Sequence, residues 1–258
     1  MRTLTVAVLI FSVASAYGNE AQWPVRWTKH VALTNVADIE RLLAEPVRIP
    51  CSGCSLRMKN DFGDEGRLVT TGQEWLQARE DGLGPMTTYD LSMSSWFQFS
   101  AGTLARLRYA KPSRASYVKD VVFSTNALWL LPATLHNRSR AALEDAVREG
   151  RLDKAVGELS FGDLCPGAAV ESATPYSIVF TYSGMKVYLK LAAWGDFDHD
   201  GIEDLLCEYS LLYLGGSGRF YNHVILSRLG PGKQLEERTI EGLGQRLRRE
   251  SESFEGGP

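Results

Sequence analysis

The sequence predicts an α+β protein, in which a mainly helical N-terminal part is followed by an antiparallel β-meander. Up to about residue 160, apolar residues recur every three or four positions, as they do on one face of a helix. Beyond residue 161 the apolar period changes to alternation, in segments rich in β-branched and aromatic residues. The predicted organisation is a signal peptide over residues 1–16, a mainly helical region over 17–160, an antiparallel β region over 161–240 and a polar tail over 241–258.

The first residues are typical of a secretory signal. Arg2 provides a short positive region, the apolar run Leu4–Val13 follows, and Ala14–Ala16 supplies the small residues that a signal peptidase requires. An apolar run of about ten residues is too short for a membrane span, which needs about twenty. No later stretch approaches that length, so we expect an exported, periplasmic or secreted protein with no membrane span in the mature chain.

Three helices are predicted in the N-terminal part. Asn35 can cap a helix whose apolar residues have helical spacing and which Pro46 would end. A second helix is expected from Ser100 to the proline at Pro112. A third is expected over Ser139–Gly150, where an acidic and a basic residue lie four positions apart and glycine ends the run.

Four strands are predicted in the C-terminal part, joined as a meander. The segment 162–175 contains several small and turn-forming residues and is interpreted as a loop. Ser183-Gly184 forms a two-residue turn between two alternating segments, the pattern of a β-hairpin. The predicted strands are Tyr176–Tyr182, Met185–Leu191, Leu205–Leu214 and Phe220–Leu229.

The charge balance argues against nucleic acid as a partner. The chain has 28 basic and 31 acidic residues, a net charge of −3, and the basic residues form no stripe. Proteins that bind nucleic-acid backbones need clustered positive charge. The sequence identifies no other partner.

The connection Trp194–Leu206 contains the densest group of acidic residues in the β region. Three aspartates occupy alternate positions, Gly201 follows at once, and a fourth aspartate closes a nine-residue span. A tight loop can direct alternate side chains to one centre, and calcium requires six to eight oxygen ligands. Gly201 would allow a sharp bend with positive φ. The expected calcium ligands are the side chains of Asp196, Asp198, Asp200 and Asp204 and the backbone carbonyl of Ile202, whose side chain would anchor the loop in the core.

The pattern D-x-D-x-D-G-x-x-D over these residues resembles the calcium loops of FG-GAP and VCBS-type repeats, and more distantly those of dockerins and EF-hands. An EF-hand would have a glutamate at loop position twelve, but Cys207 stands there and Glu208 comes one residue later. Repeat families of this type form propellers from several copies, whereas this chain has one copy. The resemblance therefore implies the loop and its ligands, and not the propeller.

A solvated acidic turn is the alternative interpretation of this loop. However, five carboxylates within nine residues repel one another, by about 1 kcal/mol per pair at 4 Å in water and by more near a protein surface. A bound cation would relieve this repulsion, which favours the metal site. Calcium is preferred over magnesium, which keeps more of its own waters. His199 falls at a non-ligand position and is expected to face solvent.

The cysteines at Cys51, Cys54, Cys165 and Cys207 predict two disulfides, because an even number in an exported protein usually pairs. Of three possible pairings, sequence proximity favours Cys51–Cys54 and Cys165–Cys207. The C-x-x-C segment could instead be a redox pair, although no thioredoxin-like βαβ pattern surrounds it.

No catalytic motif supports an enzyme more strongly than a binding protein. The histidines at positions 30, 136, 199 and 223 lie outside any G-x-S-x-G nucleophile motif. The sequence therefore favours an exported calcium-binding protein with a structural or binding role. The alternative is a periplasmic thiol-disulfide oxidoreductase that uses Cys51 and Cys54.

Overall fold

The computed structural model describes residues 26–27, 33, 35–49, 51, 55–60, 66–136, 140–216 and 218–238. Over these residues the chain combines helices with antiparallel sheets, so the predicted α+β class is confirmed. The predicted signal peptide and polar tail lie outside the described residues.

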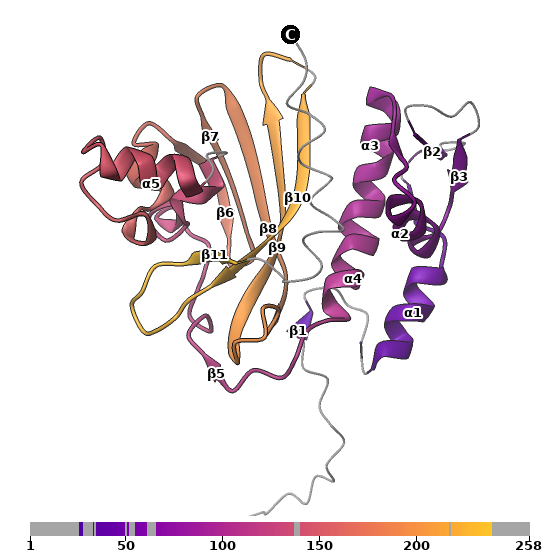
Figure 1. Cartoon of the computed structure of the whole chain (residues 1–258), viewed down its shortest axis with the longest axis horizontal. Helices are drawn as coiled ribbons and strands as arrows, with labels where there is room; N and C mark the ends of the chain where they lie inside the picture. Colours follow the sequence, from indigo (N-terminus) through magenta and orange to yellow (C-terminus); the bar gives the residue numbers. More distant parts are fainter. Residues whose placement is uncertain are drawn as a thin grey trace, which may run out of the picture.

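The centre of the molecule is an antiparallel meander in which each strand pairs with its neighbours in the chain (Figure 1). The order across the sheet is β11-β10-β9-β8-β7-β6. Two short strands join it from the N-terminal part, β1 antiparallel to β8 and β5 parallel to β9. The strands are β1 (Arg26–Trp27), β5 (Ala115–Ser116), β6 (Ala169–Thr174), β7 (Ser177–Tyr182), β8 (Met185–Gly195), β9 (Ile202–Tyr213), β10 (Arg219–Ser227) and β11 (Glu236–Arg238).

The four predicted strands correspond to β7–β10; β7 and β10 agree with their predicted bounds within two residues, whereas β8 continues four residues further and β9 begins three residues earlier. Ser183 and Gly184 have φ values of 45° and 74°, which suits the predicted two-residue turn. Segment 162–175, interpreted as a loop, contains α6 and the edge strand β6. Because β8 continues to Gly195 and β9 begins at Ile202, the acidic connection between them is only six residues long.

The first helical layer begins with α1 (Val36–Ala44), capped by Asn35, whose side chain accepts the Asp38 N–H as predicted. The helix expected from Ser100 begins earlier, at Thr88. Helix α3, a π-helical turn and α4 follow one another without a break over residues 88–107. Helix α2 and a small sheet in the order β3-β2-β4 were not predicted from the sequence. These elements are β2 (Leu56–Lys59), β3 (Arg67–Val69), α2 (Gly72–Glu80), β4 (Gly84–Pro85), α3 (Thr88–Phe97), η1 (Gln98–Gly102) and α4 (Thr103–Leu107).

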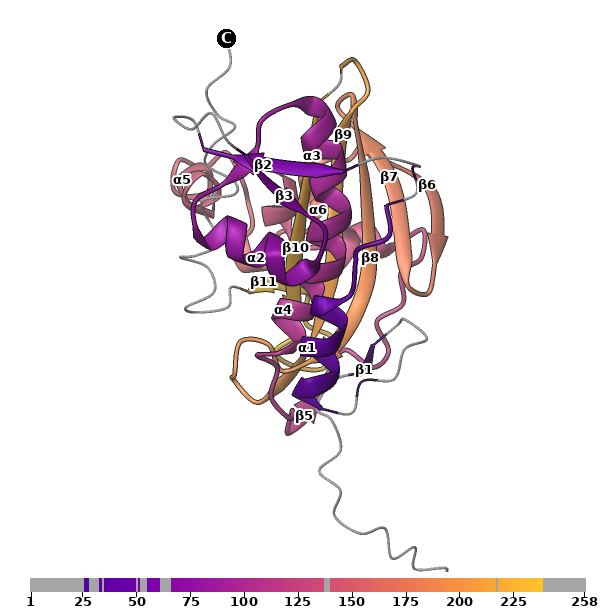
Figure 2. The same ribbon diagram turned by 90° about the vertical axis from the view of Figure 1, so that its right-hand side faces the viewer.

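A second set of helical elements lies on the other side of the sheet (Figures 1 and 2). The third predicted helix is present as α5, although Ser139 lies outside the described residues. Gly150, just beyond it, has a φ of 70° and ends the helix as expected. These elements are η2 (Ala127–Trp129), η3 (Ala133–His136), α5 (Arg140–Arg148), η4 (Val156–Glu158) and α6 (Phe161–Leu164).

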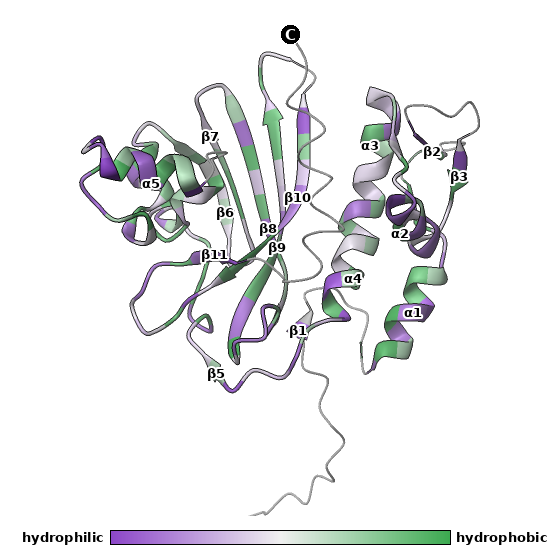
Figure 3. Cartoon of the chain, viewed as in Figure 1, coloured by the Kyte–Doolittle hydropathy of each residue, from purple (hydrophilic) through white to green (hydrophobic). Residues whose placement is uncertain are grey.

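The sheet is therefore buried on both faces over much of its area. Leu206 and Ile225 face the core beneath α1–α4, whereas Leu205 and Cys207 face the core on the α6 side. Where β8 and β9 are covered on both faces their residues are buried continuously, and in the first half of β8 and the second half of β9, where one face is open, buried and more exposed residues alternate (Figure 3). Among the described residues, no helix is long and apolar enough to cross a membrane.

Candidate metal centre

The loop 196–201 turns the chain from β8 to β9 and is shaped by aspartate side chains that bind its own backbone. Asp204 Oδ2 accepts the Phe197 N–H at 2.9 Å, and Asp196 Oδ2 accepts the Gly201 N–H at 3.0 Å. Gly201 has a φ of 88°, which explains the glycine at this position. Each of these bonds fixes one carboxylate oxygen and thereby orients the other.

Three of the predicted ligands come together. Carboxylate oxygens of Asp196, Asp198 and Asp204 all lie within 4.8 Å of one another, close enough to hold a metal ion. The residues Asp196 and Asp204 are only 2% and 0% exposed. The Oδ1 atom of each is buried and has no hydrogen-bond partner among the described residues. Buried carboxylate oxygens that lack a hydrogen-bond partner are the pattern that a bound cation would satisfy, and the Ser227 hydroxyl lies near enough to Asp204 to lower the pKa of that carboxyl.

The surroundings oppose negative charge on these groups in the metal-free state. Burial raises the pKa of Asp204 to about 7. Burial is also the largest cause that raises the pKa of Asp198, and the neighbouring Asp200 carboxylate adds to it. Both shifts show that the charged carboxylates lack sufficient solvation.

The other two predicted ligands lie outside this cluster. Asp200 Oδ1 accepts the Ile202 N–H at 2.7 Å, and its Oδ2 accepts a hydrogen bond from Arg238 Nη2 at 3.2 Å. Arg238 Nε also forms a 3.0 Å ion pair with Asp198 Oδ2. A nearby acid, Glu203, is neutralised separately by Arg26 at 2.9 Å. Arg238 thus faces the loop from β11, a contact that the sequence analysis did not foresee.

The segment 109–116, called the clasp below, lies against the outside of the loop. Lys111 and Asp196 exchange backbone hydrogen bonds of 2.9 and 3.3 Å, and the Gly201 carbonyl accepts the N–H groups of both Arg114 and Ala115. His199, predicted to face solvent, is exposed but also forms a 2.6 Å hydrogen bond to the backbone of this segment, at the Tyr109 carbonyl. The loop therefore connects the end of the first helical layer to the sheet.

The loop is anchored in the core by a different side chain from the one predicted. Phe197 is fully buried in the core between the first helical layer and the sheet. Ile202, the first residue of β9, is only half-buried. The expectation that the Ile202 side chain anchors the loop is corrected to Phe197.

The predicted Cys165–Cys207 disulfide is not formed, and both residues carry thiols. Cys165 lies close enough to Tyr182 to affect its pKa. Tyr182 aligns through β8 with Tyr213, which is six residues beyond Cys207 on β9. At about 3.3 Å per residue the two rows are roughly 20 Å apart, whereas a disulfide needs Cα atoms within about 7 Å. The two cysteines occupy different parts of one core.

Cys51 is disulfide-bonded and exposed, but Cys54 lies outside the described residues, so the pairing of these two cysteines stays a prediction. Among the described residues, the first element after Cys51 is strand β2. In many oxidoreductases the attacking thiol lies instead at the N-terminus of a helix, which lowers its pKa. This placement gives the oxidoreductase alternative no support.

Thiol counting is expected to find two reactive thiols, Cys165 and Cys207, in the denatured and non-reduced protein. In the native protein Cys207 should be protected, because it is 0% exposed and burial raises the pKa of its thiol. Alkylation followed by peptide mapping, with and without denaturant, measures both. A count of zero thiols in denaturant would restore the second disulfide.

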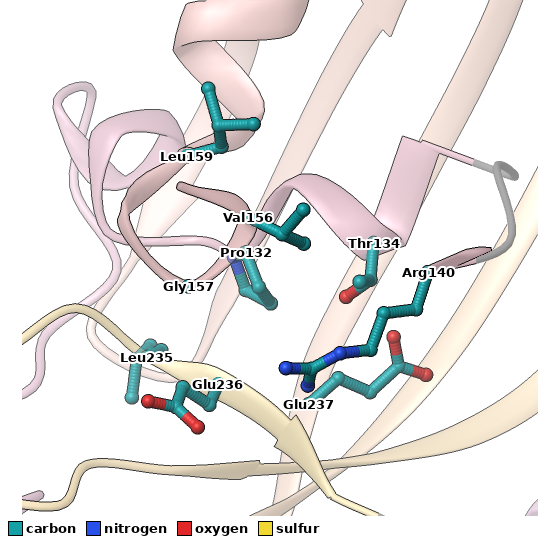
Figure 4. Close-up of a pocket in the computed structure, with 9 residues that line it drawn as sticks. All are labelled: Pro132, Thr134, Arg140, Val156, Gly157, Leu159, Leu235, Glu236 and Glu237. Atoms are coloured by element: carbon teal, nitrogen blue, oxygen red, sulfur yellow. The ribbon is translucent and has the colours of Figure 1, made fainter. Parts of the chain in front are cut away.

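One small hollow of about 30 Å³ lies beside β11 (Figure 4). Glu236 and Glu237 of β11 form one wall, and Arg140 reaches in from α5. The remaining lining residues are Pro132, Thr134, Val156, Gly157, Leu159 and Leu235.

Comparison of the chain with protein-family models, with curated proteins and with solved structures gave no match. The resemblance of the acidic loop to FG-GAP and VCBS-type loops therefore stays a prediction from the residues. The functional conclusion depends on the geometry of the site.

Proposed function

We propose that this chain is an exported calcium-binding protein with a structural or binding role, and that Ca²⁺ is held at the turn between β8 and β9. The observation that carries the proposal is that carboxylate oxygens of Asp196, Asp198 and Asp204 lie within 4.8 Å of one another, and that two of these residues, Asp196 and Asp204, each have a buried oxygen without a hydrogen-bond partner among the described residues. Completion of the ligand set by Asp200, the Ile202 carbonyl or water would follow the pattern of the sequence.

Electrostatics supports a cation at this point. Transfer of a carboxylate from water into a protein interior costs several kcal/mol unless an opposite charge compensates it. Arg238 reaches Asp198, and Arg26 neutralises Glu203. Among the described residues, no basic side chain forms an ion pair with Asp196 or Asp204. A divalent ion would compensate both carboxylates.

The donor set favours calcium over transition metals. All three clustered ligands are carboxylates, which suit hard cations, and the described cluster includes neither histidine nor cysteine. A flexible ring of oxygens from a short loop fits the variable coordination of calcium better than the strict octahedron of magnesium. An extracellular calcium module has a dissociation constant on the order of 10⁻⁴ to 10⁻³ M, which suits an exported protein.

The contacts of the loop favour a structural role for the ion. The loop touches the clasp 109–116, the core through Phe197, and β11 through Arg238. An ion that fixes the loop would therefore fix the junction between the first helical layer and the sheet.

Calcium is expected to stabilise the protein against heat. With the affinity given above, 10 mM calcium should add about 1.4 to 2.7 kcal/mol to the free energy of unfolding. For a chain of this size the melting temperature should rise by roughly 3 to 10 °C relative to chelator. Differential scanning calorimetry of the mature chain measures this shift, and isothermal titration should give one site. Magnesium at the same concentration should have a smaller effect.

Two variants test whether the stabilisation by calcium depends on the loop. Asp198→Ala should lose the calcium-dependent rise, whereas Asp153→Asn, an exposed acid after α5, should keep it. If chelator and calcium leave the wild-type melting temperature equal, the proposal fails.

A further inference from the structure

Arg238 connects the edge of the sheet to the acidic loop. It lies on β11, a strand of three residues whose only strand partner among the described residues is β10. Its guanidinium forms an ion pair with Asp198 at 3.0 Å and a hydrogen bond with Asp200 at 3.2 Å. The contact is well sheltered, since the side chains of Arg238 and Asp198 are 30% and 11% exposed.

We propose that Arg238 is an internal cation that competes with the metal ion for Asp198 and Asp200, so that ion binding and the β11 contact oppose each other. This inference rests on the proposed function, because it assigns a regulatory residue to the same site.

The hydrogen bonds of the loop divide the aspartates into two kinds. Asp196 and Asp204 each have one oxygen bound to backbone and one without a partner. Asp198 and Asp200 have both oxygens engaged, one with a backbone N–H and the other with Arg238. Asp196 and Asp204 are thus ready for an ion, Asp198 already lies in the cluster but shares its carboxylate with Arg238, and Asp200 must turn away from Arg238 to join them.

The positive charge of Arg238 also opposes ion binding. A guanidinium held against Asp198 lies within a few ångströms of the space that the three carboxylates surround, and its positive charge repels a divalent ion there. The coupling is reciprocal by thermodynamic necessity. The Arg238 contact weakens ion binding by a certain free energy, and ion binding weakens the contact of Arg238 with the loop by the same free energy. Any release of β11 from the loop should be limited to the last residues of the strand. Leu235, just before the strand, is 1% exposed and donates its N–H to the Leu130 carbonyl, which holds it in place.

Calcium titration of Arg238→Gln against the wild type tests the competition. We expect the variant to bind calcium about tenfold more tightly. Arg238→Lys, which keeps the charge but lacks the planar fork, should fall between them. Arg41→Gln, which removes a surface ion pair on α1, is the matched control and should bind like the wild type. Equal or weaker binding by Arg238→Gln would overturn the competition. If neither wild type nor variant binds calcium, the proposed function fails and the coupling fails with it.

Hydrogen exchange on the wild-type protein tests the same coupling without a variant. Calcium should slow the exchange of the loop amides over 196–202. It should speed the exchange of the β11 amides, where Arg238 pairs with Ile225 of β10. The opposite signs at the two sites distinguish competition from general stabilisation. Slower exchange at both sites would overturn the proposal.

Discussion

Replacing Asp204 by asparagine is expected to raise the free energy of unfolding of the metal-free protein, by at most about 4 kcal/mol above pH 7, and to abolish its response to calcium. Asp204 is 0% exposed, and its Oδ1 has no partner among the described residues. Asparagine can still accept the Phe197 N–H and removes the buried charge. A residue retained only for stability would show the reverse effect, because its loss would weaken the fold.

The effect of this substitution on the free energy of unfolding should depend on pH. The pKa of Asp204 is raised to about 7 in the folded protein, above its ordinary value of 3.8. Between these values the folded state binds more protons than the unfolded state, so this group lowers stability as pH rises. Without metal, the difference between wild type and variant should grow from near zero at pH 4 to at most about 4 kcal/mol above pH 7.

Urea unfolding in chelator at pH 5 and pH 7.5 measures this difference, and Asp153→Asn serves as the control for a change of net charge. With saturating calcium the order should reverse at pH 7.5, because the wild type then gains the ion and the asparagine variant does not. A variant that is less stable than the wild type in chelator at neutral pH would contradict the prediction.

Local signals in the sequence predicted the elements whose determinants are neighbours in the chain. Asn35 caps α1 through the Asp38 N–H, and Ser183-Gly184 closes the β7–β8 hairpin. The alternation predicted in Met185–Leu191 follows from a stretch of β8 that has one buried and one exposed face. Such patterns need no knowledge of the tertiary structure.

The missed elements have weak local patterns. Helix α3 places serines at the buried positions Ser94 and Ser95, so its apolar periodicity is faint, and packing against the neighbouring elements supports it instead. Strand β6 is mostly exposed at the sheet edge and lacks the alternating apolar face of a buried strand. Its backbone pairing with β7 makes it a strand.

The same distinction applies to the site. Spacing alone placed Asp196, Asp198 and Asp204 in one loop, and the structure brings them together. The clasp and Arg238 come from about 90 residues before and 38 residues after their partners in the loop, where no spacing rule applies. The Cys165–Cys207 prediction relied on order in the sequence, and a long sheet can separate residues that share one core.

Replacing Phe197 by alanine is expected to lower the free energy of unfolding by about 3 to 5 kcal/mol, the usual cost of truncating a buried aromatic ring. The ring is 0% exposed, and it lies between two of the proposed calcium ligands, Asp196 and Asp198. Its burial fixes the backbone that directs those carboxylates toward one point. We therefore expect calcium affinity to fall as well, although the alanine variant keeps every ligand.

Ile202→Ala is the matched control, because this side chain belongs to the same turn but is only half-buried, and it should cost less than about 1.5 kcal/mol. Urea unfolding in chelator gives the two stability changes, and calcium titration of the folded variants gives the affinities. Equal costs for the two variants would show that Ile202 shares the anchoring role. Unchanged calcium affinity in Phe197→Ala would show that the hydrogen bonds from Asp196 and Asp204 to the loop backbone hold the ligands in place without the core.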